Sequence, residues 1–388
     1  MRLRTFAYTQ FPKTSREWTL SGLTLGRINL VVGKNASGKS RTLSTINGLG
    51  YLVSGRRRPS DLSTGTYEAI FDHEGRTQRY FIDILDRKVV SEQFSDGDEV
   101  LLTRGAGGVG KIFHEKQKDH FEFQTPEGDA AVVARRDSIQ HSFLEPLAQW
   151  GEGVRHYEFG DKMGHGTLTL FVQDGPIPDP RDVNAIVALF RKGVKDFPDR
   201  FAAEVRDGMN AIGYEITEVD LMVPTDIMLM MPVGGRVEPL ILFVQERDLP
   251  CRTQQTDMSQ GMFRAVSVII LLSYAVIASR PSCIIVDDIG EGLDFERSCK
   301  LIELMRRRAQ ESDIQLIVST NDMFVMNEVP LDEWSVLRRQ GNQVTVRNHE
   351  NSKKEFEYFR FVGMSNFTFF EMDFANGIPM METALTHE

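Results

Sequence analysis

The residues whose chemistry is easiest to infer lie near the amino end of the chain, where the sequence GKNASGKS occupies residues 33–40. It satisfies the pattern G-x-x-x-x-G-K-[ST], in which backbone N–H groups of a glycine-containing loop hold phosphate oxygens. Lys39 would reach the β- and γ-phosphates of a nucleotide, and Ser40 would ligate Mg²⁺. A glycine- and serine-rich turn without a ligand is the alternative, and the flanking elements decide between the two.

Those flanking elements favour the phosphate site. Residues 28–32 (INLVV) are mostly apolar and predict a short buried strand, whereas Leu43, Ile46, Leu49 and Leu52 recur at helical spacing. A helix N-terminus adds positive potential to the loop that precedes it. We therefore expect nucleotide contacts from Gly33, Asn35, Ala36, Ser37, Gly38, Lys39, Ser40 and Arg41.

Two adjacent carboxylates, Asp287 and Asp288, end the apolar run 283–286. Such a run predicts a strand of a parallel sheet, and its carboxyl end would lie at the edge where the phosphate loop lies. Asp287 would then hold Mg²⁺, and Asp288 would orient or deprotonate an attacking water. A helix N-cap or a simple turn is the alternative, and the continuation IGEGLD, which ends at Asp294, disfavours it.

A third segment, residues 258–261 (MSQG), precedes a long apolar stretch that predicts a helix over 261–278. Ser259 is placed to cap this helix. The helix N-terminus would then face a phosphate group.

These segments together resemble the motifs of ABC-type ATPases. Residues 287–294 (DDIGEGLD) resemble the Walker B motif and D-loop, usually D-E-P-x-x-x-L-D, and residues 258–261 resemble the signature motif L-S-G-G. The strand 314–319 and the Asn321 after it resemble the switch of this family, which commonly has His there. The resemblance implies a homodimer, with higher oligomers left open, that sandwiches ATP and Mg²⁺. Its site residues would be Lys39, Ser40, Asp287 and Asp288 in cis and Ser259, Gln260 and Gly261 in trans, with Asp294 near the nucleotide.

Within that family the chain most resembles the RecF/OLD-like branch, also called AAA_21-type ATPases. About 220 residues separate Ser40 from Ser259, the phosphate loop has the form Gly-x-Asn-x-Ser-Gly-Lys-Ser, and no long heptad run lies between them. The resemblance implies an α/β fold: an ABC-type P-loop NTPase core, with a mixed sheet and an antiparallel β-layer, an inserted α+β region and a helical signature lobe. Many bacterial members of the branch belong to anti-phage defence operons.

Two departures from the family pattern predict slow ATP hydrolysis. The resemblance assigns catalysis to Asp288, Asn321 and Lys39. Asp288 replaces the usual Glu and retracts the carboxylate by one methylene, and a misplacement of about 1 Å can cost on the order of 10²-fold in rate. Asn321 can donate a hydrogen bond but cannot exchange a proton as His can. Slow turnover suits a timed switch.

Two weaker patterns need separate treatment. Residues 105–110 (GAGGVG) satisfy G-x-G-x-x-G, but the charged stretch 111–123 predicts an extended hairpin arm where a dinucleotide site needs a helix. We therefore expect a hairpin loop there. For the family's Q-loop glutamine, Gln140 is a candidate on position alone.

Composition is that of a water-soluble, cytoplasmic protein: 388 residues, 41% hydrophobic and 26% charged. The apolar run 266–277 is too short to span a bilayer, the first residues do not resemble a signal peptide, and the three cysteines lack metal-ligand spacing. The net charge of −10 disfavours direct DNA binding. Basic clusters at 56–58 and 306–308 keep DNA binding open, although solvated faces are the plainer interpretation.

We divide the chain into four parts: 1–94 (core with phosphate loop and β-layer), 95–213 (insertion and helical region), 214–334 (signature to switch) and 335–388 (hairpin and Phe-rich tail). The β-layer is predicted from alternation over 67–81 and 83–94, with turns at Gly75 and at 86–87. Other predicted elements are a helix over 183–212 interrupted at Pro198, strands over 214–222, 227–233 and 240–245, and a hairpin over 335–347.

The tail is dense in aromatic residues. Packing against the core is the plain interpretation, and a docking surface for a partner protein is the alternative. The residues concerned are Phe356, Tyr358, Phe359, Phe361, Phe367, Phe369, Phe370 and Phe374.

The leading functional hypothesis is therefore an ATP-dependent sensor or scaffold that controls an effector protein encoded nearby in bacterial anti-phage defence. The alternative is a RecF-like DNA-binding clamp in recombination and repair. The energising subunit of a transporter is least favoured, because the insertion is long and no membrane-coupling segment is evident.

Overall fold

The structure is a computed structural model that describes residues 1–159, 165–166, 169–172, 182, 185–225, 237–279 and 282–376. The chain forms two compact units, each built from segments distant in sequence. Unit 1 contains residues 1–154, 281–285 and 315–388, and unit 2 contains residues 155–280 and 286–314. The four-part division predicted from the sequence remains a prediction.

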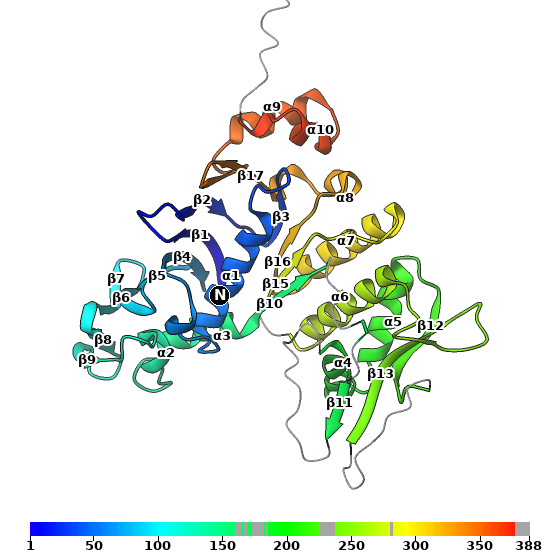
Figure 1. Cartoon of the computed structure of the whole chain (residues 1–388), viewed down its shortest axis with the longest axis horizontal. Helices are drawn as coiled ribbons and strands as arrows, with labels where there is room; N and C mark the ends of the chain where they lie inside the picture. Colours follow the sequence, from blue (N-terminus) through cyan, green and yellow to red (C-terminus); the bar gives the residue numbers. More distant parts are fainter. Residues whose placement is uncertain are drawn as a thin grey trace, which may run out of the picture. The chain divides into compact units, whose positions relative to one another are not determined.

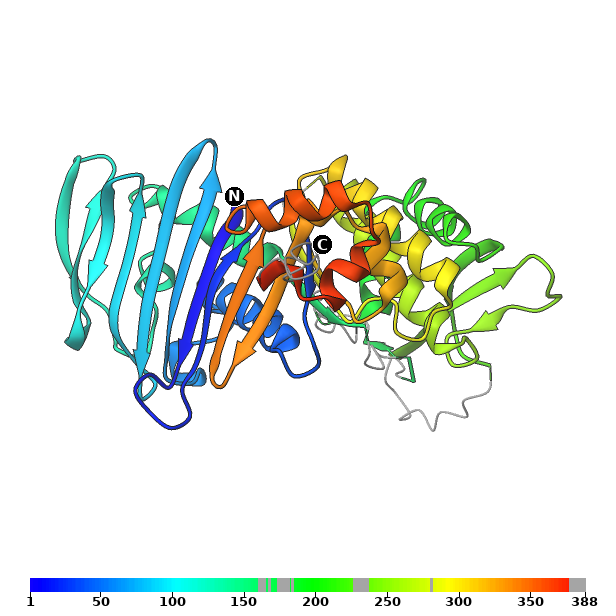
Figure 2. The ribbon, with the colours of Figure 1, turned by 90° about the horizontal axis from the view of Figure 1, so that it is seen from above.

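Fourteen strands of the described residues form one mixed sheet in the order β10-β15-β16-β3-β17-β18-β2-β1-β4-β5-β6-β7-β8-β9. The order interleaves the two ends of the chain, because β16 and β17 flank β3 in parallel and β18 pairs with β2. From β2 to β9 every neighbour is antiparallel, and Figure 2 shows these strands side by side. The predicted α/β class, with a mixed sheet that continues into an antiparallel layer, is confirmed.

The strands of this sheet, except β18, are labelled in Figure 1. Their bounds are β1 Arg2–Gln10, β2 Trp18–Thr24, β3 Ile28–Val32, β4 Gly65–His73, β5 Arg76–Leu85, β6 Lys88–Asp96, β7 Glu99–Arg104, β8 Val109–His114, β9 Asp119–Gln124, β10 Val154–Glu158, β15 Ser282–Asp287, β16 Ile314–Ser319, β17 Trp334–Gln340 and β18 Gln343–Asn348. The helices of unit 1 are α1 Lys39–Val53, α2 Ala131–Ala134, α3 Glu145–Gly153, α8 Met323–Glu328, α9 Lys353–Val362 and α10 Asn366–Glu371, and short turns of 3₁₀ helix include η2 Ala106–Gly108 and η5 Phe374–Asn376.

The turns of the β-layer lie where the sequence predicted them. Gly75, Asp86 and Arg87 all have positive φ, as tight hairpins between right-twisted strands require. The GAGGVG segment is a loop between β7 and β8, as predicted, and not a dinucleotide site. Gly108 is required there, because a Cβ would lie 1.9 Å from the carbonyl oxygen of Thr125.

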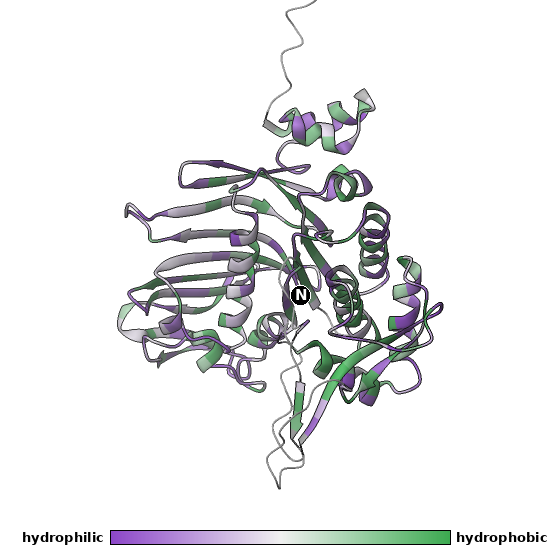
Figure 3. Cartoon of the chain, turned by 45° about the vertical axis from the view of Figure 1, so that its right-hand side comes forward, coloured by the Kyte–Doolittle hydropathy of each residue, from purple (hydrophilic) through white to green (hydrophobic). Residues whose placement is uncertain are grey.

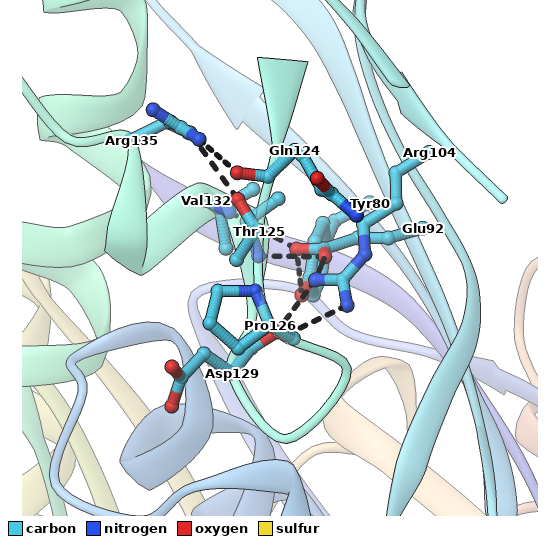
Figure 4. Close-up of polar contacts among 10 residues, drawn as sticks. Tyr80, Glu92, Arg104, Gln124, Thr125, Pro126, Asp129, Val132 and Arg135 are labelled. Carbon is cyan, nitrogen blue, oxygen red and sulfur yellow. Dashed lines mark hydrogen bonds and ion pairs between the residues drawn. The ribbon is translucent and has the colours of Figure 1, made fainter. Parts of the chain in front are cut away.

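A buried ion pair, not anticipated from the sequence, fixes the chain that follows β9 (Figure 4). Glu92 and Arg104 have fully buried side chains, 3.5 Å apart. Glu92 accepts hydrogen bonds from Tyr80 and from the backbone N–H groups of Ala131 and Val132 at the start of α2. Arg104 donates to backbone carbonyls in the segment 126–129. Burial raises the pKa of Glu92, and its hydrogen-bond donors oppose that rise.

Unit 2 is organised around one apolar helix, α6 (Gln260–Ile277), against which α4, α5 and α7 pack. By length and composition α6 could cross a bilayer, but 72% of it is buried inside the protein, as in a core helix. Figure 3 shows the apolar colour along this helix. The other elements are β11 Thr169–Val172, α4 Ile186–Asp196, α5 Phe201–Ala211, β12 Ile216–Met222, β13 Val237–Glu246, β14 Thr253–Gln254 and α7 Phe295–Gln310.

Most helices and strands predicted for unit 2 are present. The helical region does break around Pro198, between α4 and α5, and its first two residues, 183–184, lie outside the described residues. The predicted strand 227–233 also lies outside them. One residue of the basic cluster 306–308 departs from the expected solvated face. Arg308 is buried and binds Ser273 and Glu204 at 2.8 Å each, so it joins α7 to α6 and α5.

The Phe-rich tail combines packed and exposed rings. Phe356, Phe359, Phe369 and Phe374 are buried and in mutual ring contact, as the packing interpretation predicts. Phe361, by contrast, is 91% exposed on α9. The docking interpretation therefore stays a prediction for the exposed rings.

Candidate nucleotide site

The phosphate loop of unit 1 turns between β3 and α1 through two left-handed residues, Ala36 (φ 62°) and Gly38 (φ 102°). Lys39, the first residue of α1, is only 7% exposed. Its Nζ donates to the carbonyl oxygen of Gly33 at 2.8 Å and to Oδ1 of Asn321 at 2.9 Å. The structure therefore brings the predicted lysine and the predicted switch residue together.

The register of the parallel strands explains why Lys39 and Asn321 lie together. In the parallel pair of β3 and β16, Val31 lies opposite Ser319, so both strands deliver their next residues to the same edge of the sheet. Asn321 follows β16 by two residues, and Asp322 then caps α8 by accepting hydrogen bonds from Phe324 and Val325. The switch position is thus held between the end of a core strand and a helix cap.

Two observations indicate that the loop is suited to a phosphate group. Ser37 Oγ is buried and, within the described part of the chain, has no hydrogen-bond partner. A Cβ added at Gly33 would lie 2.4 Å from that same oxygen, so a side chain at position 33 would fill the cradle. A buried polar atom without a partner is costly, and a phosphate that draws hydrogen bonds into this loop would relieve that cost.

Residues remote in sequence brace the loop from outside. Trp18 of β2, 2% exposed, and Val344 of β18 both lie 3.4 Å from where a Cβ of Gly38 would be. Arg339 of β17 donates to the carbonyl oxygen of Ala36 at 3.2 Å. The sequence contains no signal for these contacts, because they join the two ends of the chain.

Arg41, predicted to contact the nucleotide, lies against the ring of Trp18, the residue that also braces the phosphate loop. Its guanidinium lies 4.1 Å from the centroid of the Trp18 ring and donates to Gln10. Desolvation lowers the pKa of Arg41, Tyr8 opposes this, and Arg339 lowers it further. The cation is thus oriented by an aromatic face.

The carboxylate pair belongs to unit 2. Asp287, 4% exposed, ends β15, and its carbonyl oxygen accepts from the N–H of Phe159 at 2.8 Å. Asp288 has a left-handed backbone, φ 54°, a conformation that Asp tolerates better than most side chains. His156, which the sequence reasoning missed, is close to Asp287: burial lowers its pKa, and Asp287 raises it. The shared Mg²⁺ predicted for Ser40 and Asp287 stays a prediction.

The signature segment leads into a helix, as predicted. This helix, α6, begins at Gln260, one residue before the predicted start. Ser259 is its N-cap, and its Oγ accepts from the N–H of Met262 at 3.2 Å. Ser259 and Gln260 are exposed. A Cβ on Gly261 would lie 2.3 Å from the carbonyl oxygen of Gly292, so the signature glycine packs on the D-loop backbone of its own chain.

Asp294 ends the D-loop as the N-cap of α7. Its carboxylate accepts from the N–H of Arg297 at 3.0 Å and pairs with the guanidinium of the same residue at 2.5 Å. These hydrogen bonds hold the pKa of Asp294 below its usual range. The carboxylate is therefore ionised near neutral pH.

The prediction for Gln140 is wrong. Its carbonyl oxygen accepts from the N–H of Glu115, the residue that follows β8. In the strand order β8 stands nine places from β3, which at the usual strand spacing is about 40 Å along the sheet. Gln140 therefore lies far from the phosphate loop.

No family model matches this chain, and no curated protein matches it. Among solved structures, an SMC head bound to the C-winged helix domain of ScpA matches with a TM-score of 0.54 and 14% identity, covering 91% of this chain and 100% of that one. More distant likenesses are an SMC head domain from Thermotoga maritima (TM-score 0.45, 12% identity, 90% and 99% covered) and an SMC head with an extended coiled coil bound to a ScpA domain derived from Pyrococcus furiosus (0.49, 13%, 92% and 99%). At this identity the likeness concerns the fold: the chain has the ABC-type ATPase fold of an SMC head.

Proposed function

We propose that this protein binds ATP, hydrolyses it slowly, and assembles head to tail around the nucleotide. The observation that carries the proposal is the phosphate loop, in which Lys39 lies between Gly33 and Asn321 beside the unpartnered Ser37 hydroxyl. Strand, loop and helix follow one another there as a phosphate site requires. The ABC-type ATPase fold supports the same conclusion.

Each cis residue has a definable role in this proposal. The N–H groups of residues 36–40 hold the phosphates, and Lys39 neutralises charge on the β- and γ-phosphates. Ser40, an exposed hydroxyl, and Asp287, a buried carboxylate, are a donor set that suits Mg²⁺, which takes few protein ligands and keeps several waters. Mg²⁺ would supply charge neutralisation on the phosphate oxygens.

Slow hydrolysis follows from the two departures from the ABC-type motif, Asp288 in place of Glu and Asn321 in place of His. Asp288 positions the attacking water with a shorter side chain than the usual Glu, and its left-handed backbone favours Asp at that point. Asn321 accepts a hydrogen bond from Lys39, but its amide cannot take up and release a proton as the usual His can. We expect Asp288→Glu combined with Asn321→His to raise turnover, measured as phosphate release under saturating ATP. Unchanged turnover would contradict the assigned roles.

We further propose that the assembled state controls an effector protein, as a sensor or scaffold in bacterial anti-phage defence. The resemblance of the phosphate loop and signature segment to RecF/OLD-like ATPases supports this assignment. The solved SMC head was bound to a winged-helix domain, which shows that this fold can carry a partner. The exposed rings of the C-terminal element, Phe361 above all, offer an anchor for one.

A RecF-like DNA clamp is the second candidate, favoured by the exposed Arg57 and Arg58 and disfavoured by the net charge of −10. It predicts ATP-stimulated, salt-sensitive binding to a short DNA duplex. Binding that is absent at low salt with ATP present would eliminate it.

The decisive experiment measures the mass of the protein with and without ATP–Mg²⁺. We expect ATP-driven assembly of the wild type and its loss in Ser259→Arg, because a large cation would occupy the trans phosphate face. Ser279→Arg, an exposed serine beyond the other end of α6, is the matched control and should assemble normally. Equal assembly of both variants would refute the trans role of the signature segment.

A further inference from the structure

A histidine outside the sequence motifs binds the segment that carries the signature serine. His165 lies in unit 2, and its Nε2 is 2.9 Å from the carbonyl oxygen of Met258. Its own carbonyl oxygen accepts a hydrogen bond from Nε2 of Gln255 at 3.2 Å. Its ring packs on Phe263 of α6, with the ring centroids 5.0 Å apart. These three contacts join one residue to the chain on both sides of Ser259.

The partners of His165 are themselves held by the core of unit 2. Gln255 is 1% exposed and exchanges two hydrogen bonds with Leu242 of β13. Its N–H donates to the carbonyl oxygen of Leu242 at 2.8 Å, and its Oε1 accepts from the N–H of Leu242 at 3.1 Å. Met258 and Phe263 are also buried. His165 therefore ties the signature segment to groups that the fold already holds in place.

The hydrogen bond to Met258 sets the direction of a donor on Ser259. A carbonyl oxygen can only accept, so Nε2 of His165 carries the hydrogen and donates it. The carbonyl group of Met258 and the N–H group of Ser259 belong to one peptide bond, which is planar and trans. In a trans peptide these two groups point in opposite directions. His165 therefore turns the N–H of Ser259 away from itself.

That direction matters because Ser259 caps α6 at an exposed position. The first N–H groups of a helix have no partner within the helix, and they form the positive end of its dipole. A phosphate group binds them well only when their peptide planes face it. If the peptide between residues 258 and 259 faced the phosphate for only part of the time, the apparent affinity would fall by that fraction.

We propose that His165 is a positioning residue, which fixes the peptide between Met258 and Ser259 so that the signature segment meets the nucleotide of a second copy of this chain in one orientation. This role rests on the proposed function and adds a residue to the trans side of the site. His165 acts through the peptide that it holds and does not itself contact the nucleotide.

Two substitutions separate the hydrogen bond from the ring contact. His165→Phe keeps a ring against Phe263 and removes the donor, whereas His165→Gln removes the ring and keeps an N–H group that can bind Met258. One neutral hydrogen bond corresponds to about a fivefold change in an equilibrium constant. His165→Phe should therefore weaken ATP-driven assembly about fivefold at each of the two sites of a dimer, or about 25-fold in total. His165→Gln should assemble within about twofold of wild type, because the hydrogen bond is kept.

Tyr274→Phe is the matched control for the loss of one hydrogen bond from α6. The hydroxyl of Tyr274, near the other end of that helix, donates to Oδ2 of Asp196 at 2.9 Å. The control should assemble as wild type does. If Tyr274→Phe or His165→Gln loses as much assembly as His165→Phe, a general loss of stability explains the effect and the positioning role is wrong.

ATP binding by dilute, unassembled protein separates positioning from damage to the fold. We expect wild type and both His165 variants to bind ATP with equal affinity in a calorimetric titration, because the phosphate loop lies in unit 1. A fall in ATP affinity in parallel with the fall in assembly would overturn the proposal.

Ser259→Arg, measured alongside, distinguishes failure of this role from failure of the proposed function. We expect loss of assembly in Ser259→Arg, partial loss in His165→Phe and recovery in His165→Gln. Loss in Ser259→Arg together with normal assembly of His165→Phe would refute the positioning role and leave the proposed function standing. Normal assembly of Ser259→Arg would refute the trans site itself, and the role of His165 with it.

Discussion

The phosphate loop of unit 1 and the signature face of unit 2 are predicted to hold the same kind of ligand, yet they are built differently. Lys39 and Ser37 are 7% and 5% exposed, and strands from both ends of the chain brace their loop. Ser259, Gln260 and Asp294 are exposed and held by helix caps. The loop is organised within one chain, whereas the signature face leaves its functional groups at the surface for another molecule.

The difference has a physical basis. A buried cation such as Lys39 needs hydrogen-bond partners as soon as the chain folds. Its partners are therefore residues of the same chain. An exposed hydroxyl or carboxylate is solvated by water, so leaving it without a protein partner costs little free energy until a ligand binds. Variants should therefore affect nucleotide affinity on one side and assembly on the other.

The largest expected effect breaks the loop itself. Lys39→Met removes the only charge we assign to the β- and γ-phosphates, and ATP affinity should fall about 100-fold, the loss expected from two charge-assisted hydrogen bonds. Lys34→Met, an exposed lysine in the same loop, is the matched control and should bind ATP within a few-fold of wild type. Calorimetric titration of each variant measures the difference. Equal losses would mean that loop charge, and not the Lys39 geometry, holds the nucleotide.

The next effect breaks the signature face and spares the loop. Gly261→Ala places a Cβ 2.3 Å from the carbonyl oxygen of Gly292, so the start of α6 must move away from the D-loop. We expect ATP-driven assembly to fall at least about tenfold, since a displacement of about 1 Å can cost 10²-fold, while ATP affinity is retained. Gly166→Ala, in the same unit with nothing within 4 Å of its Cβ, should assemble normally. Loss of ATP binding in Gly261→Ala would remove the distinction between the two faces.

A smaller effect separates cap stability from assembly. Ser259→Ala removes the N-cap of α6 and should lower the free energy of unfolding by about 1 kcal/mol, measured in urea. Ser365→Ala removes the equivalent cap of α10 in unit 1, where Ser365 accepts from the N–H of Thr368, and should cost a similar amount. Only Ser259→Ala should also weaken assembly. If both variants weaken ATP-driven assembly equally, Ser259 acts only as a helix cap and has no separate role in assembly.

The smallest perturbation uses the native cysteines. Burial raises the pKa of Cys283, in β15, to about 12, so its thiol stays protonated and inaccessible at neutral pH. Cys251, in the loop that precedes the signature segment, is exposed. A maleimide should label Cys251 in folded protein and leave Cys283 unlabelled until denaturant is added, as peptide mass mapping would report. Early labelling of Cys283 would mean that β15 opens readily.

Local patterns predicted the elements well. The strand 28–32 is β3, the helix after the loop begins at Lys39, and the signature helix begins at Gln260. These predictions succeeded because apolar periodicity and helix caps depend on residues close in sequence. The prediction for Gln140 failed because it relied on chain position, and the long β-layer carries that residue far along the sheet.

By itself, the sequence determined the phosphate loop, the order of the motifs and the kind of fold, since each depends on short runs of residue types. Only the tertiary structure decided what supports them: Trp18 and Arg339 behind the loop, Asn321 on Lys39, and the backbone of Gly292 against Gly261. Those contacts join residues tens to hundreds of positions apart. Their formation depends on strand order and register, which a one-dimensional pattern does not encode.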